Sequence, residues 1–92
     1  MLFYNLLQLF VKNIPSNMSP MEVSRIFATF GKVHKFMQDP VRKQVVYVLM
    51  NSENAQKAIN SLHGKAIAKN CHPLVVEQSK EVSKLVFKAH VR

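Results

Sequence analysis

Apolar residues recur along part of the chain with the spacing of one helical face. The stripe has the i, i+3, i+4, i+7 pattern and consists of Val23, Ile26, Phe27 and Phe30. Ser19, followed three residues later by Glu22, forms a capping-box pattern at the start of this stripe. Gly31 comes directly after it and suits the left-handed position that ends a helix. The sequence therefore predicts a helix that begins at Pro20 and ends before Gly31.

A second stripe with the same spacing precedes the other glycine, Gly64. Its members are Ala55, Ala58, Ile59 and Leu62. Asn51 or Ser52 is the expected N-cap. These side chains are smaller than those of the first stripe, so the second helix is expected to lie close against its neighbour.

Four further segments have the β-branched, aromatic and alternating composition of strands. They are residues 9–14, 33–38, 44–50 and 74–78. The short link at 39–42, Asp-Pro-Val-Arg, predicts a hairpin between the second and third strands. The element order is then β-α-β-β-α-β, the split βαβ arrangement of ferredoxin-like α+β folds. Since each helix has one apolar stripe, we expect both helices to cover one face of a four-stranded antiparallel sheet and the other face to be open.

This fold predicts a core on the helix-facing side of the sheet. The residues expected to be buried there are Val11, Val23, Ile26, Phe27, Phe30, Phe36, Val46, Val48, Ala58, Ile59, Leu62, Leu74 and Val76.

The two ends of the chain fall outside this pattern. Residues 1–8 are predicted to be an apolar leader, with a signal peptide as the alternative, and 9–80 to be the folded domain. The extension 81–92 repeats helical spacing at Val82, Leu85, Val86 and Ala89. It is expected to be a short helix that docks over the sheet, or else a strand fragment or a disordered segment.

Composition adds a strong positive charge. The chain has 92 residues, with 13 Lys and Arg against 5 Asp and Glu, for a net charge of +8. Such a balance favours a polyanionic partner, either nucleic acid or an anionic membrane. Cys71 is the single cysteine, so no internal disulfide can form, and the four histidines lack metal-ligand spacing. We expect no metal and no cofactor.

Two strand motifs resemble those of the RNA recognition motif family. Residues 9–14, L-F-V-K-N-I, resemble the family's RNP hexamer, and residues 43–50, K-Q-V-V-Y-V-L-M, resemble its RNP octamer. The Phe30-Gly31 pair and the A-x-x-A-I-x-x-L-x-G run at 55–64 also fit. The V-E-Q-S-K ending at 76–80 is most similar to Lark-type members. The resemblance covers about 9–80 and implies the strand order 4-1-3-2 and binding of single-stranded RNA.

Strand alternation indicates which side chains such an RNA would meet. Phe10 and Tyr47 are expected to point outward on neighbouring strands, where bases stack on aromatic rings. The octamer departs from the family pattern at Gln44, Val45 and Met50, and Val45 removes one stacking platform. Met37 is expected outward beyond a bulge in the second strand, and Glu77 faces the same surface. The predicted RNA-binding residues are Phe10, Lys12, Lys35, Met37, Lys43, Val45, Tyr47, Glu77 and Lys80, of which Lys12, Lys35 and Lys43 are expected to neutralise phosphates.

The sequence also allows comparison with two other function classes. The first is a protein-interaction module with weak or no RNA binding, which Val45 and Glu77 favour. The second is an acylphosphatase-like enzyme, but the loop at 15–19 has neither the glycine nor the arginine that its anion site requires. The expected protein is thus a monomeric, non-enzymatic RNA-binding module of mRNA processing, splicing or translational regulation. Its expected location is the nucleus, with the cytoplasm as the alternative, and no membrane is involved.

Overall fold

The computed structural model describes residues 6–67 and 72–79. Its elements are β1 (Leu6–Lys12), α1 (Pro20–Ala28), β2 (Val33–Gln38), β3 (Val46–Asn51), α2 (Ser52–Leu62) and β4 (Val75–Gln78). This is the predicted β-α-β-β-α-β order. No helix in the described ranges is long and apolar enough to span a bilayer.

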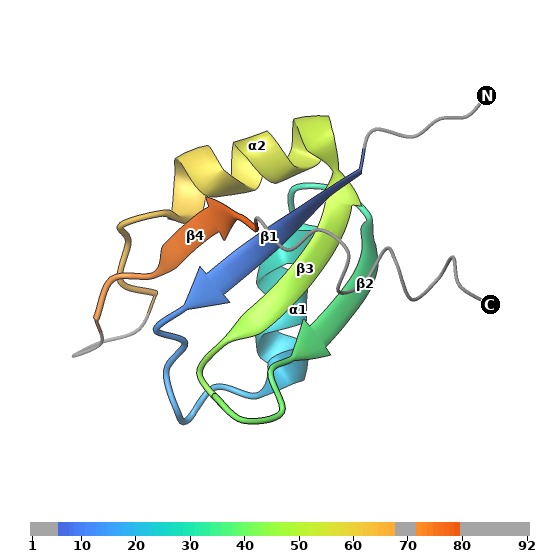
Figure 1. Ribbon diagram of the computed structural model, residues 1–92. Coiled ribbons are helices and arrows are strands. Elements are labelled where there is room, and N and C mark those ends of the chain that lie inside the picture. The colour runs from blue at the N-terminus through green and yellow to red at the C-terminus, as the bar shows by residue number, and fades with distance from the viewer. Residues whose placement is uncertain (1–5, 68–71, 80–92) are drawn as a thin grey trace, which may run out of the picture.

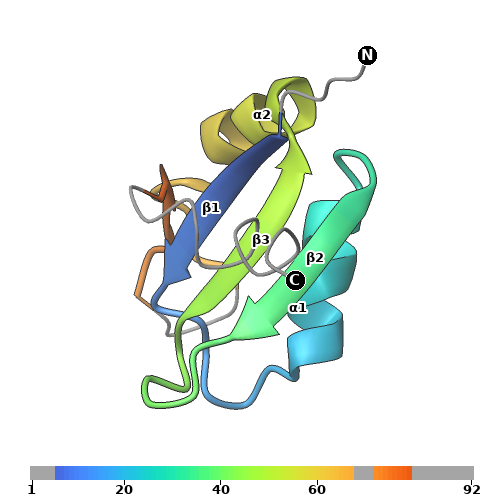
Figure 2. The same ribbon diagram turned by 45° about the vertical axis from the view of Figure 1, so that its right-hand side comes forward.

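The four strands form one antiparallel sheet in the order β2-β3-β1-β4. The two motif-bearing strands, β1 and β3, are adjacent at its centre, as the resemblance implies. Both helices lie on the same face of the sheet, and α2 starts at the end of β3 (Figures 1 and 2). The α+β sandwich with helices on one face is therefore confirmed.

The core lies between the sheet and the helices. Nine of the predicted core residues are buried, and they are Val11, Val23, Phe27, Val46, Val48, Ala58, Leu62, Leu74 and Val76. The other four, Ile26, Phe30, Phe36 and Ile59, are partly buried against this cluster. The cluster also includes Leu9, Ile14, Met50 and Ala55. Leu9 is buried because it lies on the same face of β1 as Val11, the face that the helices cover.

The capping box of α1 forms as predicted. The Glu22 backbone N–H donates to Ser19 Oγ at 3.2 Å, and the Ser19 N–H donates to Glu22 Oε1 at 2.8 Å. The helix ends at Ala28 with Thr29 as C-cap, so Gly31 lies further from its end than expected. Gly31 has φ +147°, and a Cβ there would overlap the side-chain amide of Asn54 in α2. Glycine is therefore required both by the backbone and by close approach of α2.

The second helix begins as predicted but without a side-chain cap. Asn51 occupies the N-cap position and makes no capping hydrogen bond. At the other end, His63 follows the helix and its Nδ1 accepts a hydrogen bond of 3.0 Å from the Val76 N–H of β4. Since β4 is an edge strand, this N–H points away from β1 and would otherwise have no ladder partner.

Strand β2 contains the predicted bulge. Its pairing with β3 shifts register between Val33 and Lys35, so that Phe36 pairs with Val48 on the core side and Met37 pairs with Tyr47. Beyond β2, the Asp39 N–H donates to the Val45 carbonyl at 2.9 Å and closes the predicted hairpin.

Two predicted boundaries are wrong. β1 starts at Leu6, so residues 6–8 belong to the sheet and not to a leader, because they continue the pairing with β3 as far as Asn51. β3 starts at Val46, since Lys43 and Gln44 are taken up by the hairpin turn. The predictions for 1–5, for 81–92 and for Cys71 lie outside the described residues.

Candidate nucleic-acid interface

The face of the sheet opposite α1 and α2 is called the outer face. Its side chains are those that alternate with the core residues of each strand. Phe10 on β1 pairs with Tyr47 on β3 and with Glu77 on β4, so these three form a row across three strands. The predicted positions of these residues on one surface are confirmed.

Phe10 is a partly buried ring flanked by two cations. Lys12 Nζ lies 5.8 Å from its ring centroid, and the guanidinium carbon of Arg42 lies 5.7 Å from it. The Tyr47 ring is also close, with centroids 5.7 Å apart and the planes tilted by 38°. An aromatic surface bordered by cations suits a ligand that combines a flat ring with phosphate groups.

Tyr47 is held by the hairpin. Its hydroxyl donates to Asp39 Oδ2 at 3.1 Å and accepts from Arg42 Nη2 at 3.2 Å. Arg42 Nη2 also donates to Asp39 Oδ2 at 3.1 Å. These three side chains tie the turn between β2 and β3 to the centre of the outer face.

Asp39 anchors this network as a carboxylate. Its Oδ1 accepts the backbone N–H groups of Arg42 and Val41, both at 2.9 Å. These two bonds, with smaller contributions from the Arg42 and Tyr47 side chains, hold the pKa of Asp39 well below its usual range. The same contact with Asp39 raises the pKa of Arg42. The hairpin therefore carries a fixed negative charge that orients a guanidinium toward Phe10.

The expectation of an open outer face is wrong along β3. Val45, Tyr47 and Leu49 are only 5%, 3% and 5% exposed. They form a second apolar cluster, against which Leu6, Phe10 and Met37 pack. Alternation predicted which way these side chains point, but the bonds of Asp39 and Arg42 to the Tyr47 hydroxyl were not foreseen. Phe10 is the more accessible of the two predicted stacking rings.

The predicted cations lie at several places around this cluster. Lys12 and Lys35 are exposed on β1 and β2, and Lys35 pairs with Leu49. Glu77 is exposed beside Phe10. Met37 packs against the apolar cluster, as its predicted outward direction requires. Lys80 lies outside the described residues. The lysines thus border the outer face and do not form one patch.

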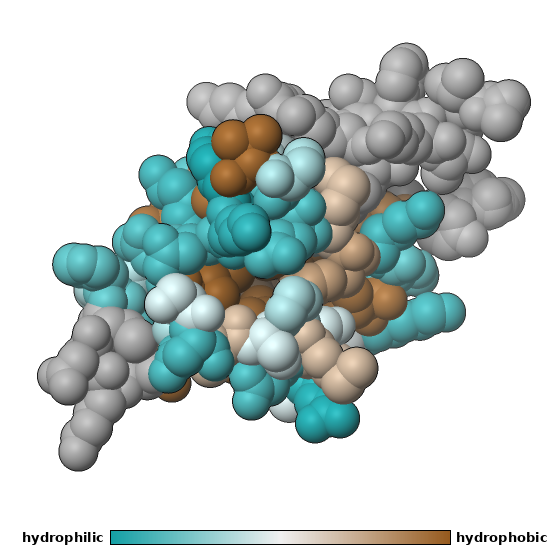
Figure 3. Space-filling view, turned by 90° about the horizontal axis from the view of Figure 1, so that it is seen from below, coloured by the Kyte–Doolittle hydropathy of each residue, from teal (hydrophilic) through white to brown (hydrophobic). Residues whose placement is uncertain are grey.

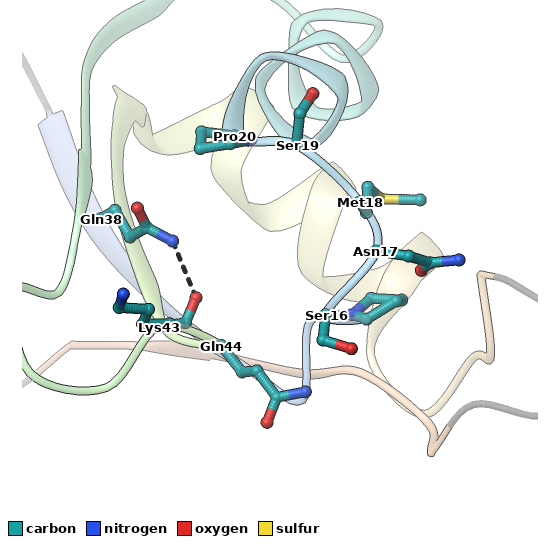
Figure 4. Close-up of a pocket in the computed structure, with 9 residues that line it drawn as sticks. Ser16, Asn17, Met18, Ser19, Pro20, Gln38, Lys43 and Gln44 are labelled. Atoms are coloured by element: carbon teal, nitrogen blue, oxygen red, sulfur yellow. Dashed lines mark hydrogen bonds between the residues drawn. The ribbon is translucent and has the colours of Figure 1, made fainter.

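Lys43 lines a hollow at the hairpin end of the sheet. The hollow measures about 370 Å³ and separates the loop at 15–20 from Gln38, Lys43 and Gln44 (Figure 4). Gln38 Nε2 donates to the Lys43 carbonyl at 2.8 Å across its side. Seen from this end, the described surface is mostly hydrophilic with smaller apolar areas between (Figure 3). Lys43 therefore lies at the hairpin end of the sheet, beside this hollow.

Asp39 and Arg42 are the functional candidates that sequence reasoning missed. They were treated only as a link between strands. An available signal was the pairing of Asp39 with an arginine three residues later in a tight turn, because aspartate in such turns accepts nearby backbone N–H groups. No group of three His, Cys, Asp or Glu side chains suited to a metal ion occurs within the part of the chain that the structure describes.

A comparison with protein families identifies the family of the chain. The model of the RNA recognition motif family matches residues 9–72, which contain both strand motifs and both helices. This chain belongs to the RNA recognition motif family. The family is an RNA-binding domain and not an enzyme class. A comparison with curated proteins gave no match.

Solved structures agree with this assignment. The RNA recognition motif of S. pombe Puf1 is 22% identical with a TM-score of 0.70, and the match covers 79% of this chain and 88% of that one. A structure described as "SXL-LETHAL PROTEIN/RNA COMPLEX" is 26% identical with a TM-score of 0.69, and the match covers 78% of this chain and 47% of that one. The third RNA recognition motif of Mip6 is 29% identical with a TM-score of 0.62, covering 78% and 91%.

Proposed function

We propose that this RNA recognition motif binds single-stranded RNA on its outer face, with one base stacked on Phe10. The observation that carries the proposal is the position of Phe10 on a central strand, with Lys12 and Arg42 within 6 Å of its ring centroid. A base on this ring gains stacking energy, while its phosphates meet the flanking cations. Lys35 on β2 and Lys43 in the turn between β2 and β3 extend the positive border.

The expected affinity is modest. Each base that stacks on an aromatic ring contributes about 1–3 kcal/mol. The octamer has Val45 where the family pattern has a ring, and Tyr47 is buried and hydrogen-bonded to Asp39. One readily accessible ring therefore supports binding in about the micromolar range or weaker for an isolated module.

The test is NMR chemical-shift mapping of the full chain with a pool of randomised short RNAs. Shifts confined to Phe10, Lys12 and Glu77 and their strand neighbours are expected. Perturbations restricted to α1 and α2, or none at all at millimolar RNA, would contradict the proposal.

A protein-interaction role is the second candidate. The observation that favours it is the set of partly exposed apolar side chains that cover the outer-face cluster, namely Leu6, Phe10 and Met37. A peptide that packs on apolar side chains depends little on salt, whereas RNA binding weakens steeply as salt rises. A salt titration of each ligand's affinity therefore separates the two.

For the biological setting we propose mRNA processing or translational regulation, and the nucleus as the place of action. The support is family membership together with the net charge of +8. Crosslinking of the tagged chain in fractionated cells tests this, since recovery of nuclear precursor RNA is expected. Recovery of no RNA from either fraction would contradict it.

A further inference from the structure

Phe10 has the side chain of Arg42, a hydrogen-bond donor, on one side and that of Glu77, an acceptor, on the other. The strand order places β3 and its hairpin on one flank of β1 and β4 on the opposite flank. Arg42 reaches the ring from the hairpin side, and Glu77 is the register partner of Phe10 on the β4 side. A base stacked on Phe10 would thus lie between the guanidinium of Arg42 and the carboxylate of Glu77.

Arg42 is held in place while keeping donors available. Its side chain is 56% exposed, although Nη2 bonds to Asp39 at 3.1 Å and to Tyr47 at 3.2 Å. A guanidinium has five N–H donors in a rigid fork, and no bond from Nη1 or Nε to another described residue is observed. Asp39 is the positioning residue, because its two backbone hydrogen bonds fix the carboxylate that holds Arg42.

The negative charge of Glu77 disfavours RNA binding on this surface unless the carboxylate accepts a hydrogen bond from the ligand. Glu77 is exposed, and it lies where negative charge repels RNA phosphates. A carboxylate accepts hydrogen bonds only, so the ligand group that it favours is an N–H group on a base edge.

We propose that Arg42 and Glu77 select guanine as the base that stacks on Phe10. This inference rests on the proposed function. Guanine presents the O6 and N7 acceptors that an arginine fork binds in bidentate fashion. It also presents N1–H and the N2 amino group, which match the two oxygens of a carboxylate. N7 and the N2 amino group lie at opposite ends of the base, as do Arg42 and Glu77 relative to Phe10.

The other bases satisfy this pair less well. Adenine places its N6 amino group beside N7, so the fork of Arg42 meets a donor. Uracil has a single N–H between two carbonyls, and cytosine has a single amino group. Each therefore leaves Arg42 or Glu77 with part of its hydrogen-bonding capacity unused.

The experiment measures the affinity of the full chain for six-nucleotide RNAs that are uridine except at one position. That position holds guanine, adenine, cytosine or uracil, or one of two guanine analogues. 7-Deazaguanine lacks N7, and hypoxanthine, the base of inosine, lacks the N2 amino group. The parent chain is expected to favour guanine over the other natural bases by about tenfold, and to bind both analogues more weakly than guanine.

Three substitutions assign the two contacts. Arg42→Met removes every hydrogen-bond donor at this position, so the penalty for 7-deazaguanine should disappear while the inosine penalty remains. Glu77→Gln should remove the inosine penalty alone. Lys12→Gln is the matched control, because it removes a cation equally close to Phe10 and should weaken all six RNAs alike.

The outcomes distinguish this inference from the function on which it rests. If all six RNAs bind equally, or if guanine preference survives Arg42→Met and Glu77→Gln together, base selection by this pair is wrong while RNA binding stands. If none of the RNAs binds, both proposals fail. A parent-like NMR spectrum of each variant confirms that the fold is intact.

Discussion

The hydroxyl of Tyr47 and the carboxylate of Asp39 are 3.1 Å apart and join the centre of the sheet to the turn between β2 and β3. Tyr47 lies on β3 beside Phe10, and Asp39 follows the last residue of β2. Tyr47 occupies a motif position at which family members commonly contact RNA, and here its hydroxyl holds the hairpin. The contact makes the hairpin part of the interface, since Arg42 is fixed by the same two groups.

Tyr47→Phe removes this hydrogen bond and the one that the hydroxyl accepts from Arg42, while keeping the ring. We expect a loss of about 0.5–1.5 kcal/mol in the free energy of unfolding, measured by urea denaturation. A double-mutant cycle with Asp39→Ala should show a coupling energy of the same size, because each change removes the contact between Tyr47 and Asp39. Strict additivity of the two changes would contradict a direct interaction.

The protonation of Asp39 predicts a dependence of stability on pH. Its pKa is lower in the folded chain than the usual value of about 3.9, so the unfolded chain takes up the proton first. This carboxylate therefore stabilises the fold above about pH 4, and the stabilisation is lost as pH falls below that value. Asp39→Asn should lower stability at neutral pH, and the difference from the parent should shrink between about pH 5 and pH 2. A difference that is constant over this range would contradict the prediction.

A substitution that removes base stacking and one that removes a positive charge should change RNA binding in different ways. Phe10→Ala is expected to weaken binding by about 1–3 kcal/mol at fixed salt with an unchanged salt slope. Lys43→Ala should weaken binding to all sequences alike and reduce the slope by about one unit. Lys57→Ala is the control, because Lys57 is exposed on α2, away from the outer face. Parent-like binding by a folded Phe10→Ala chain would favour the protein-interaction role.

Gly31→Ala and Gly64→Ala form a matched pair. Both glycines have positive φ, but only Gly31 has a neighbour, Asn54, in the space a Cβ would occupy. Gly64→Ala is expected to cost about 1–2 kcal/mol from backbone strain alone. Gly31→Ala should cost more, about 2–3 kcal/mol, because Asn54 must also move. Thermal unfolding of both variants measures this, and equal losses would show that the Asn54 side chain adjusts freely.

Phe27→Ala tests the helix–sheet core. Phe27 is fully buried on α1, and its loss leaves a cavity that the sheet cannot fill. The expected cost is about 3–5 kcal/mol, measured by chemical denaturation. Met21→Ala is a control on the same helix, since Met21 is exposed. A small effect of Phe27→Ala would mean that the packing of α1 is loose.

Local patterns predicted most of the fold because they reflect local physics. Helix spacing, the capping box of Ser19 and the alternation around Phe10 depend on residues a few positions apart. The bulge in β2 was predicted from the core positions that the family resemblance implies for Val33 and Phe36. The family resemblance supplied the strand order.

The missed features depend on contacts that no local pattern encodes. The early start of β1 follows from pairing of Leu6 with Asn51, which is distant in sequence. The burial of Tyr47 and the placing of Arg42 depend on which rotamers the hairpin side chains adopt once β2 and β3 have paired. Sequence alternation gives only the direction in which a side chain leaves the strand.

The hydrogen bond from Val76 to His63 bears on whether another strand can add to the β4 edge. An edge strand with unpaired N–H groups is a template on which another chain can add a strand and begin aggregation. β4 is only four residues long, and the imidazole of His63 occupies one of its outward donors. Incoming strands would have to displace that ring to extend the sheet. His63 thus occupies a hydrogen-bonding position on the β4 edge that an added strand would need.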